Sequence, residues 1–238
     1  MMKKSNLILF ASIIGCMTLG VMSPLTAAAI DTATTPGHIE LEENDDPTGP
    51  VDPEDPSKEM TPPDPYNPGT GNAGPLSIDV VPTSLEFGTQ KMYSTAHTYD
   101  GQKQAVDHVR QYIQISDNRD SGTYGWSLTV KQDDYLKNLS HTLTGATISL
   151  PVGTARNSLN ATPTDVDTRL TTTAVDITNT DKTVFATTKD DASPTVGKGQ
   201  STSVWTPEQV KLMIPADTAK AGDYTNTLTW TLTAVVHS

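Results

Sequence analysis

Apolar and polar side chains alternate strictly in two stretches that lie about a hundred residues apart. The first, residues 124–130, contains Trp126 and Leu128, and the second, residues 228–234, contains Trp230 and Leu232. Because successive side chains of a strand point to opposite faces, each stretch places an indole among aliphatic residues on one face. In the second stretch every residue of the opposite face is a threonine. The pattern predicts two half-buried β-strands.

Short runs of the same kind fill the chain from Leu76 onward. They are bounded by Gly, Pro, Asn and Asp, and long helical periodicity is absent. This pattern is typical of an all-β fold, an antiparallel β-sandwich of the Ig-like or Greek-key kind. We predict strands near residues 77–81, 85–87, 112–116, 125–132, 143–150, 171–176, 183–187, 202–205, 210–214 and 222–235. Short helical turns are expected near residues 104–109 and 135–139.

The first 29 residues have the composition of a secretory signal peptide. Two lysines precede an apolar run over residues 7–21, and Ala27–Ala29 end the segment with an A-x-A cleavage pattern. The run is shorter than the ~20 clean apolar residues that cross a bilayer, so we expect no membrane span in the mature chain. The single cysteine, Cys16, lies within this segment. It is either removed with the signal or, because residues 13–16 loosely resemble a lipobox, lipidated.

Residues 30–75 have the composition of a disordered linker. They hold eleven acidic residues, one basic residue and ten prolines, and therefore most of the formal net charge of −12. A segment with so few large apolar side chains cannot offset the entropy of ordering its backbone. We therefore predict an extended acidic spacer here, although a specific acidic ligand motif is the alternative.

Residues 76–238 are then expected to form one folded domain. Its 17 acidic and 13 basic residues give a mild net charge of −4, and no basic patch is interleaved with aromatic residues. This composition argues against nucleic-acid binding. With no thiol outside Cys16, we expect no metal-thiolate site and no cofactor. The C-terminal residues carry no sorting signal, so retention at a surface is expected to depend on the folded domain.

The second alternating stretch belongs to a longer motif that resembles the distal motif of WxL domains, a cell-surface module of Gram-positive bacteria. The motif consists of a Tyr, three free positions, Leu-Thr-Trp, one free position and Leu. This chain supplies it as Tyr224, Leu228, Thr229, Trp230 and Leu232. Val236 stands where the family usually has a proline.

A proximal motif, Trp126-Ser127-Leu128, supports the same resemblance. It is preceded by Asp117-Asn118-Arg119, which is similar to the Asp-x-Arg turn often found upstream in that family. The likeness covers roughly residues 76–236. It implies a secreted protein of the cell wall or cell surface, held noncovalently by a domain that binds peptidoglycan. It also implies complexes with other surface proteins for some members, and suggested roles in adhesion or in the handling of plant polysaccharides.

Two interpretations of the indoles are open. Trp126 and Trp230 could be exposed platforms that stack on sugar rings, but alternation beside Leu and Val is the ordinary pattern of core residues. We therefore expect both to pack in the core, on neighbouring or facing strands, with the two side chains close together. Trp205, next to Pro207 and near a strand end, is the better candidate for an exposed aromatic residue.

The acidic turn over residues 117–122 has two explanations. Its closely spaced oxygen-bearing side chains resemble a calcium loop, but the alternating D-x-D-x-D pattern and the distal glutamate are missing. Asx turns before a strand explain it more simply. We expect Arg119 to pair with Asp117 or Asp120, or to bind a loop carbonyl.

No pattern in the chain favours catalysis. The histidines of the domain, at positions 97, 108, 141 and 237, lack metal-ligand spacing, and no nucleophile elbow, phosphate loop or HExxH is present. The adjacent pairs Asp133-Asp134 and Asp190-Asp191 would diverge on a strand, although two carboxylates brought together by folding could serve a glycosidase. We predict a noncatalytic protein that binds peptidoglycan. The alternative is an adhesion or interaction subunit that binds another surface protein or a host-matrix protein.

Overall fold

A computed structural model describes residues 32–187 and 195–235. The chain divides into two units, Met1–Glu40 and Leu41–Ser238, and the strands that the structure describes all belong to the second. The expected signal peptide, with Cys16, lies outside the described residues. Within the described ranges, no helix has the length and apolar character to cross a membrane.

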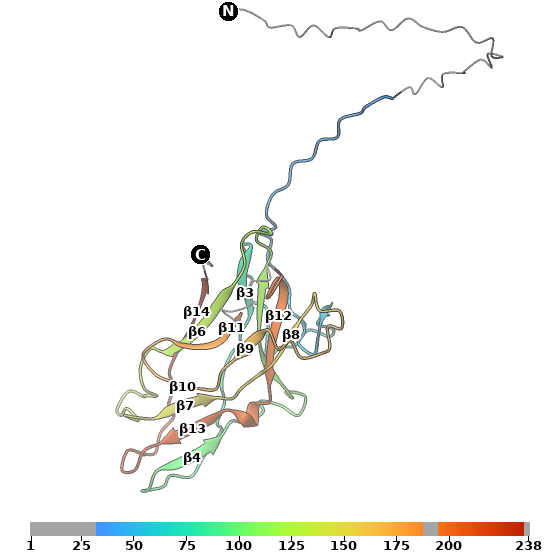
Figure 1. Cartoon of the computed structure of the whole chain (residues 1–238). Helices are drawn as coiled ribbons and strands as arrows, with labels where there is room; N and C mark the ends of the chain where they lie inside the picture. The colour runs from blue at the N-terminus through green and yellow to red at the C-terminus, as the bar shows by residue number, and fades with distance from the viewer. Residues whose placement is uncertain (1–31, 188–194, 236–238) are drawn as a thin grey trace, which may run out of the picture. The chain divides into compact units, whose positions relative to one another are not determined.

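The described strands form antiparallel sheets (Figure 1). The first sheet has the order β3 (Leu76–Val80), β5 (Gln111–Asp117), β12 (Gly199–Trp205), β8 (Thr154–Asn157). The second has the order β14 (Leu228–Ala234), β6 (Trp126–Gln132), β11 (Lys182–Thr187), β9 (Leu170–Thr172). The third has the order β10 (Val175–Ile177), β7 (Thr147–Leu150), β13 (Lys211–Ile214), β4 (His97–Asp100). A hairpin of β1 (Val51–Asp52) and β2 (Asp55–Glu59) precedes them, and a 3-10 turn, η1 (Pro207–Gln209), precedes β13.

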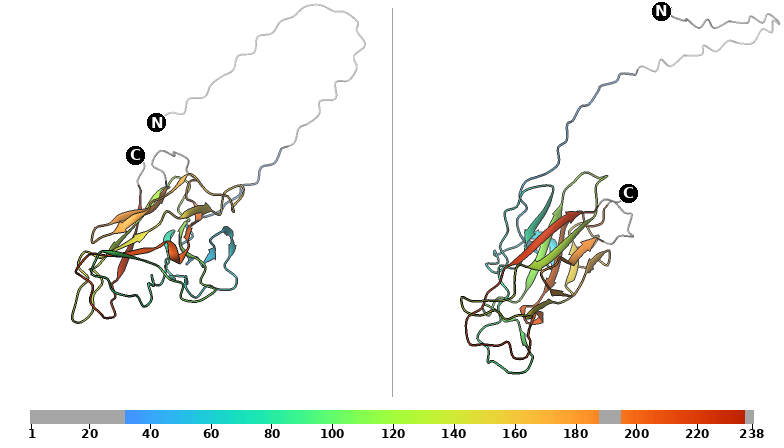
Figure 2. Two further views of the ribbon diagram at one scale, coloured as in Figure 1. Left: turned by 90° about the horizontal axis from the view of Figure 1, so that it is seen from below. Right: turned by 90° about the vertical axis from the view of Figure 1, so that its left-hand side faces the viewer.

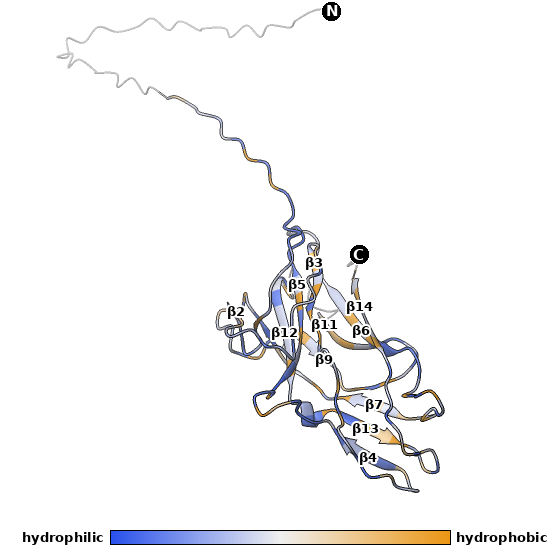
Figure 3. Cartoon of the chain, turned by 180° about the vertical axis from the view of Figure 1, so that it is seen from behind, coloured by the Kyte–Doolittle hydropathy of each residue, from blue (hydrophilic) through white to orange (hydrophobic). Residues whose placement is uncertain are grey.

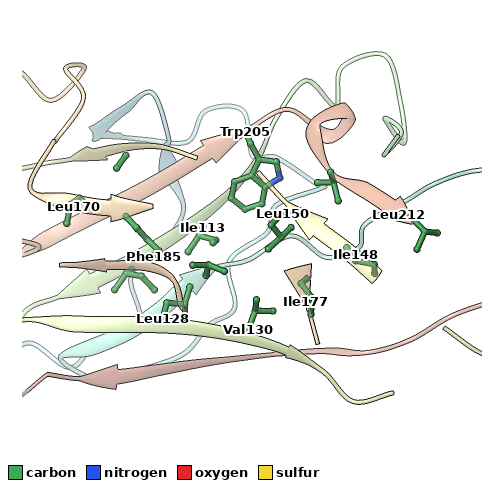
Figure 4. Close-up of a cluster of buried hydrophobic side chains, with 14 of the residues drawn as sticks. Ile113, Leu128, Val130, Ile148, Leu150, Leu170, Ile177, Phe185, Trp205 and Leu212 are labelled. Atoms are coloured by element: carbon green, nitrogen blue, oxygen red, sulfur yellow. The ribbon is translucent and has the colours of Figure 1, made fainter. Parts of the chain in front are cut away.

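The core lies where the apolar faces of these sheets meet. β6 alternates strictly between buried and half-buried residues, and Trp126, Leu128 and Val130 are fully buried. In Figure 4 the side chains of Leu128, Val130 and Phe185 lie on one side of the cluster, and those of Leu150 and Trp205 lie opposite. Burial of this apolar surface is the main stabilising term of the fold. The predicted all-β, antiparallel class is confirmed.

β5 differs from β6 because all seven of its residues are buried. One face carries Ile113 and Ile115 into the core, whereas the other carries Tyr112, Gln114 and Ser116. A strand buried on both faces needs a second cover. That cover is residues 49–70, called the strap below, and Figure 3 shows its strand β2 beside β12.

Hydrogen bonds between polar side chains attach the strap to the first sheet. The Gln114 amide accepts from the Val51 N–H at 2.8 Å and donates to the Gly49 carbonyl at 3.0 Å. The buried Asn67 amide donates to the Arg110 carbonyl at 3.1 Å, and Thr202 Oγ1 donates to the Pro53 carbonyl at 2.9 Å. The strap is therefore part of the domain.

This arrangement corrects the expectation of an extended spacer as far as residue 75. Composition predicts disorder because the strap offers little apolar surface, yet its backbone polar groups find partners in a sheet face that is itself polar. Val51 is 7% exposed and Asn67 is fully buried. Two acidic side chains of the strap, Glu54 and Glu59, are exposed.

Several predicted boundaries are wrong. No strand forms at 85–87, the run 143–150 contributes only β7, and the run 171–176 divides into β9 and β10. The last predicted strand begins at Leu228 and not at Gly222. Residues 104–109 and 135–139 contain no helix, and β4 and β8, which carry polar side chains, were missed.

Candidate functional site

The two Trp-x-Leu strands are direct neighbours. β14 pairs with β6 along its whole length, as the turned view in Figure 2 shows for the last strand and its partner. Trp230 lies opposite Val130, and Ala234 lies opposite Trp126. The indoles are therefore four residues out of register, about 13 Å along the strands at ~3.3 Å per residue. The expected neighbouring strands are present, but the expectation that the two indoles lie close together is wrong.

Trp126 is a core residue. Its side chain is fully buried and meets Phe185 edge to face, with ring centroids 4.9 Å apart. Its indole Nε1 donates to the Gly197 carbonyl at 3.1 Å. Gly197 has a φ of +73°, and a Cβ at that position would lie 2.7 Å from the indole nitrogen. The proximal tryptophan thus needs a glycine in the loop that crosses it.

The Asp-x-Arg turn beside Trp126 is a buried ion cluster. The Arg119 guanidinium binds both carboxylate oxygens of Asp117, at 2.9 and 2.8 Å, and donates to the Gly125 carbonyl at 2.9 Å. Lys198 enters from the other side, with its Nζ 3.1 Å from Asp117 Oδ1. The same ammonium donates to the carbonyls of Arg119 and Asp120 at 3.0 Å each and to that of Thr123.

In this turn, Lys198 takes the position that a calcium ion would have in a calcium loop. Its ammonium group occupies the centre of the turn and takes the carbonyl oxygens that a cation would use. Asx bonds close the turn, with Arg119 N–H donating to Asp117 Oδ1 at 3.2 Å and Gly122 N–H to Asp120 Oδ1 at 2.9 Å. In residues 32–187 and 195–235 no group of three or more His, Cys, Asp or Glu is arranged to hold a metal ion.

A second Asp-x-Arg turn repeats this geometry. Arg169 donates through Nε and Nη2 to the two carboxylate oxygens of Asp167, at 3.0 and 2.9 Å, and its N–H donates to Asp167 Oδ1 at 3.0 Å. Burial alone would raise the pKa of Asp167, but the Arg169 bonds lower it below its usual value. The repeated tripeptide was a signal in the sequence that we did not use. Lys198 had none, because its partners lie 75 to 81 residues away along the chain.

The distal tryptophan has a different environment. β14 is at the edge of its sheet, and Leu228, Trp230 and Leu232 are only half-buried. They pack on the core from outside, so Trp230 contacts the core as expected but is not enclosed by it as Trp126 is. The reason is positional: an edge strand has a neighbour on one side only, so the outer flank of a large side chain stays uncovered.

Trp230 lines a groove of about 930 Å³ at the end of the domain that carries the third sheet. The extended segment 82–92 contributes Phe87 and Lys91, and the last loop contributes Tyr224 and Asn226. Its charged side chains balance, because Glu86 and Asp223 accompany Lys91 and Lys220. The rest of the lining is uncharged: aliphatic side chains, four aromatic rings and neutral hydrogen-bonding groups.

Tyr224 closes the loop that leads into β14. Its hydroxyl donates to the Lys220 carbonyl, four residues earlier, at 2.9 Å, and its ring meets His141 edge-on at 6.1 Å between centroids. A tyrosine hydroxyl that bonds to backbone just upstream of its strand is also found in immunoglobulin-type domains, where it fixes a corner of the sandwich. The first residue of the distal motif thus shapes one wall of the groove.

Thr229 of the distal motif and Trp205 both form hydrogen bonds within the domain. Thr229 lies on the opposite face of β14, where its hydroxyl donates to Asp133 Oδ1 at 3.0 Å. Trp205 is 5% exposed, and its indole Nε1 donates to Gln111 Oε1 at 3.3 Å. The expectation that Trp205 is exposed is therefore wrong: the end of β12 is paired with β5, and the ring turns into the core.

The titratable residues considered for catalysis are dispersed. His97 stacks on Tyr93, with ring centroids 4.0 Å apart, and the His108 ring stacks on Tyr66 at 4.4 Å. Burial lowers the pKa of His108 below its usual value. Asp134 pairs with Lys137 at 2.8 Å. The pair Asp190-Asp191 lies outside the described residues.

The comparisons with known proteins agree with the motif geometry. A family model, WxL domain surface cell wall-binding, matches residues 28–235. The chain belongs to this family. The resemblance drawn from the Trp-x-Leu motifs is thereby confirmed, and so is a location at the cell wall or cell surface. The WxL match begins well before Leu76, where we placed the start of the likeness, and so includes the strap. No curated protein and no solved structure matches the chain.

Proposed function

We propose that this WxL protein is a noncatalytic wall protein whose folded domain binds peptidoglycan noncovalently through the groove beside Trp230. The observation that carries the proposal is the division between the two motifs. Trp126 is fully buried in the core, whereas Trp230 and Tyr224 line an open groove. Of the two tryptophans of the motifs, Trp230 alone has surface to offer a ligand.

The lining of the groove suits an uncharged polymer of sugars. Aromatic faces pack against the apolar faces of sugar rings, while Asn226, Thr225 and Gln90 supply neutral donors and acceptors. A groove of this volume is in the range that holds small and medium ligands. The domain has a net negative charge, to which the acidic strap adds, so it has no electrostatic attraction to the anionic polymers of a wall. This favours the neutral glycan as the recognised part.

A noncatalytic role is supported by the hydrogen bonds and ion pairs of three ionisable groups considered for catalysis. Asp133 accepts a bond from Thr229, Asp134 is paired with Lys137, and the His141 ring bonds to the Thr218 carbonyl at 2.8 Å. General acid–base chemistry needs a group held within reach of a substrate proton. Each of these groups is instead engaged in holding a turn or a strand end.

Co-sedimentation tests the proposal. The mature chain is incubated with peptidoglycan sacculi stripped of protein and of anionic polymers, then centrifuged, and the supernatant is assayed for released sugar over time. We expect saturable sedimentation of the protein and no release of sugar. A chain that stays in the supernatant would contradict wall binding, and progressive sugar release would contradict the noncatalytic role.

Other surface proteins and host-matrix proteins stay proposed partners. Binding them while the groove holds the wall requires a second surface. Among the described strands, β14 is the best suited to pairing with another chain, because it is the longest strand at the edge of a sheet.

A further inference from the structure

β14 lacks three of the features by which sheets protect their edges, namely charge, proline and a bulge, and β3 contacts it without pairing with it. It is seven residues long, and its sequence, Leu-Thr-Trp-Thr-Leu-Thr-Ala, contains no charge and no proline. Its register with β6 runs without a bulge. The other terminal strands of the three large sheets are shorter: β3 has five residues and a register shift, β4 and β8 have four, and β9 and β10 have three. Long, uncharged, regular edges are the ones that accept another strand.

The backbone groups available at this edge follow from two hydrogen bonds. Asp133 N–H donates to the Thr227 carbonyl, and Val235 N–H donates to the Gly125 carbonyl, both at 3.0 Å. Residues 227 and 235 therefore bond toward β6, and in an antiparallel ladder every second residue between them does the same. The N–H and C=O groups of the alternate residues point away from β6: Leu228, Trp230, Leu232 and Ala234.

We propose that two copies of this chain associate by antiparallel pairing of β14 with β14, about a two-fold axis at Thr231. With the axis at this residue, Trp230 pairs with Leu232 of the second copy, and Leu228 pairs with its Ala234. Each of these residues has its backbone groups directed outward, so the pairs form hydrogen-bonded steps of the ladder. This register also gives every residue of the strand a partner.

The side chains fit a second copy as well as the backbone does. The face that carries Trp230 and Leu232 is half-buried in one copy, and the pairing places the apolar residues of the second copy beside it. On the other face threonines meet threonines, a favourable cross-strand combination. Because a two-fold interface joins a surface to itself, an edge with one apolar and one threonine face and no charge is self-complementary.

The proposal goes beyond wall binding and can be tested without the wall. A single strand pair buries little surface, so the dimer is expected to be weak and concentration-dependent. Sedimentation velocity of the mature chain over a wide concentration range should show a shift from monomer to dimer. A monomer at every concentration would overturn the proposal.

Charges at the axis test the register. Thr231 is exposed, so Thr231→Lys and Thr231→Glu leave the core intact, which equal melting temperatures would verify. In each variant alone, like charges face each other across the axis, and we expect monomers. An equimolar mixture of the two should recover the dimer, because Lys then faces Glu. Thr171→Lys, at the exposed centre of edge strand β9, is the control and should dimerise like the wild type.

Two results would contradict the pairing. Dimerisation of Thr231→Lys alone at the wild-type concentration would mean that β14 is not the interface. A mixture of the Lys and Glu variants that stays monomeric would exclude the axis at Thr231.

Discussion

The ammonium group of Lys198 lies 3.1 Å from the carboxylate of Asp117, although 81 residues separate them in the chain. Both side chains are almost fully buried, and the ammonium also binds three carbonyls of the turn that leads to Trp126. This contact ties the loop before β12 to the start of β6. The proximal Trp-x-Leu motif therefore depends on a residue outside it.

Lys198→Met should destabilise the domain by roughly 3 kcal/mol, because it leaves buried carbonyls and part of a carboxylate without a partner. Urea unfolding measures the loss. Lys137→Met is the matched control, since it removes an exposed pair with Asp134 and should cost less than about 0.5 kcal/mol. Equal losses in the two variants would show that the buried cluster stabilises the domain no more than an exposed ion pair does.

Added calcium should leave the urea midpoint of the wild type unchanged, because Lys198 fills the turn.

The two motif tryptophans should differ in their contribution to stability. Trp126→Ala removes a fully buried ring and its bond to Gly197, so we expect a loss of about 3–5 kcal/mol. Trp230→Ala removes a half-buried ring at a sheet edge and should cost about 1–2 kcal/mol. The denaturant midpoints of the two variants, compared with that of the wild type, measure these losses of stability. A larger loss for Trp230→Ala would contradict the edge position described above.

The buried side chain of Asp79 should favour the folded state more at acid pH than at neutral pH. It is 1% exposed, and burial raises its pKa above the usual value despite bonds from Ser116, Ser77 and Gln114. The native state therefore holds this proton more tightly than the unfolded state does. The resulting stabilisation is present at low pH and is lost as the pH rises through the native pKa.

Asp79→Asn isolates that contribution, because asparagine keeps the shape but cannot ionise. We expect the variant to be more stable than the wild type at neutral pH, with the difference shrinking toward acid pH. Urea midpoints at several pH values measure it, and Asp181→Asn at an exposed position is the control. A variant whose advantage grows as the pH falls would reverse the sign and contradict the assignment.

Gln114 should control the attachment of the strap. Gln114→Ala removes both bonds to the segment around Val51 and the bond from Gln114 Nε2 to Asp79. Hydrogen exchange followed by mass spectrometry should show faster exchange over residues 49–59, while β6 keeps its protection, because local opening does not require global unfolding. Unchanged exchange over the strap would mean that other contacts hold it.

Alternation was enough to predict β6 and the burial of Trp126, because a strand in the middle of a sheet is covered along its whole apolar face. The same pattern overestimated the burial of Trp230, since alternation carries no information on whether a strand lies at an edge. Composition misjudged the strap because its attachment depends on polar side chains such as Gln114 and Asn67. Lys198 could not be predicted, because its role arises only when distant turns meet.

The central claim is that the groove beside Trp230, and not the buried motif around Trp126, binds the wall. Binding isotherms to stripped sacculi should be measured for the wild type, Trp230→Ala and Phe87→Ala, which change the two walls of the groove, and for Val175→Ala. Val175 packs on the core away from the groove. Because Val175→Ala also removes a partly buried apolar side chain, it is a matched control for the two groove variants. Melting temperatures establish that each variant is folded at the assay temperature. We predict that each groove variant binds about fivefold or more weakly, since an aromatic contact contributes on the order of 1 kcal/mol, while Val175→Ala binds like the wild type. Wild-type affinity in both folded groove variants would contradict the account.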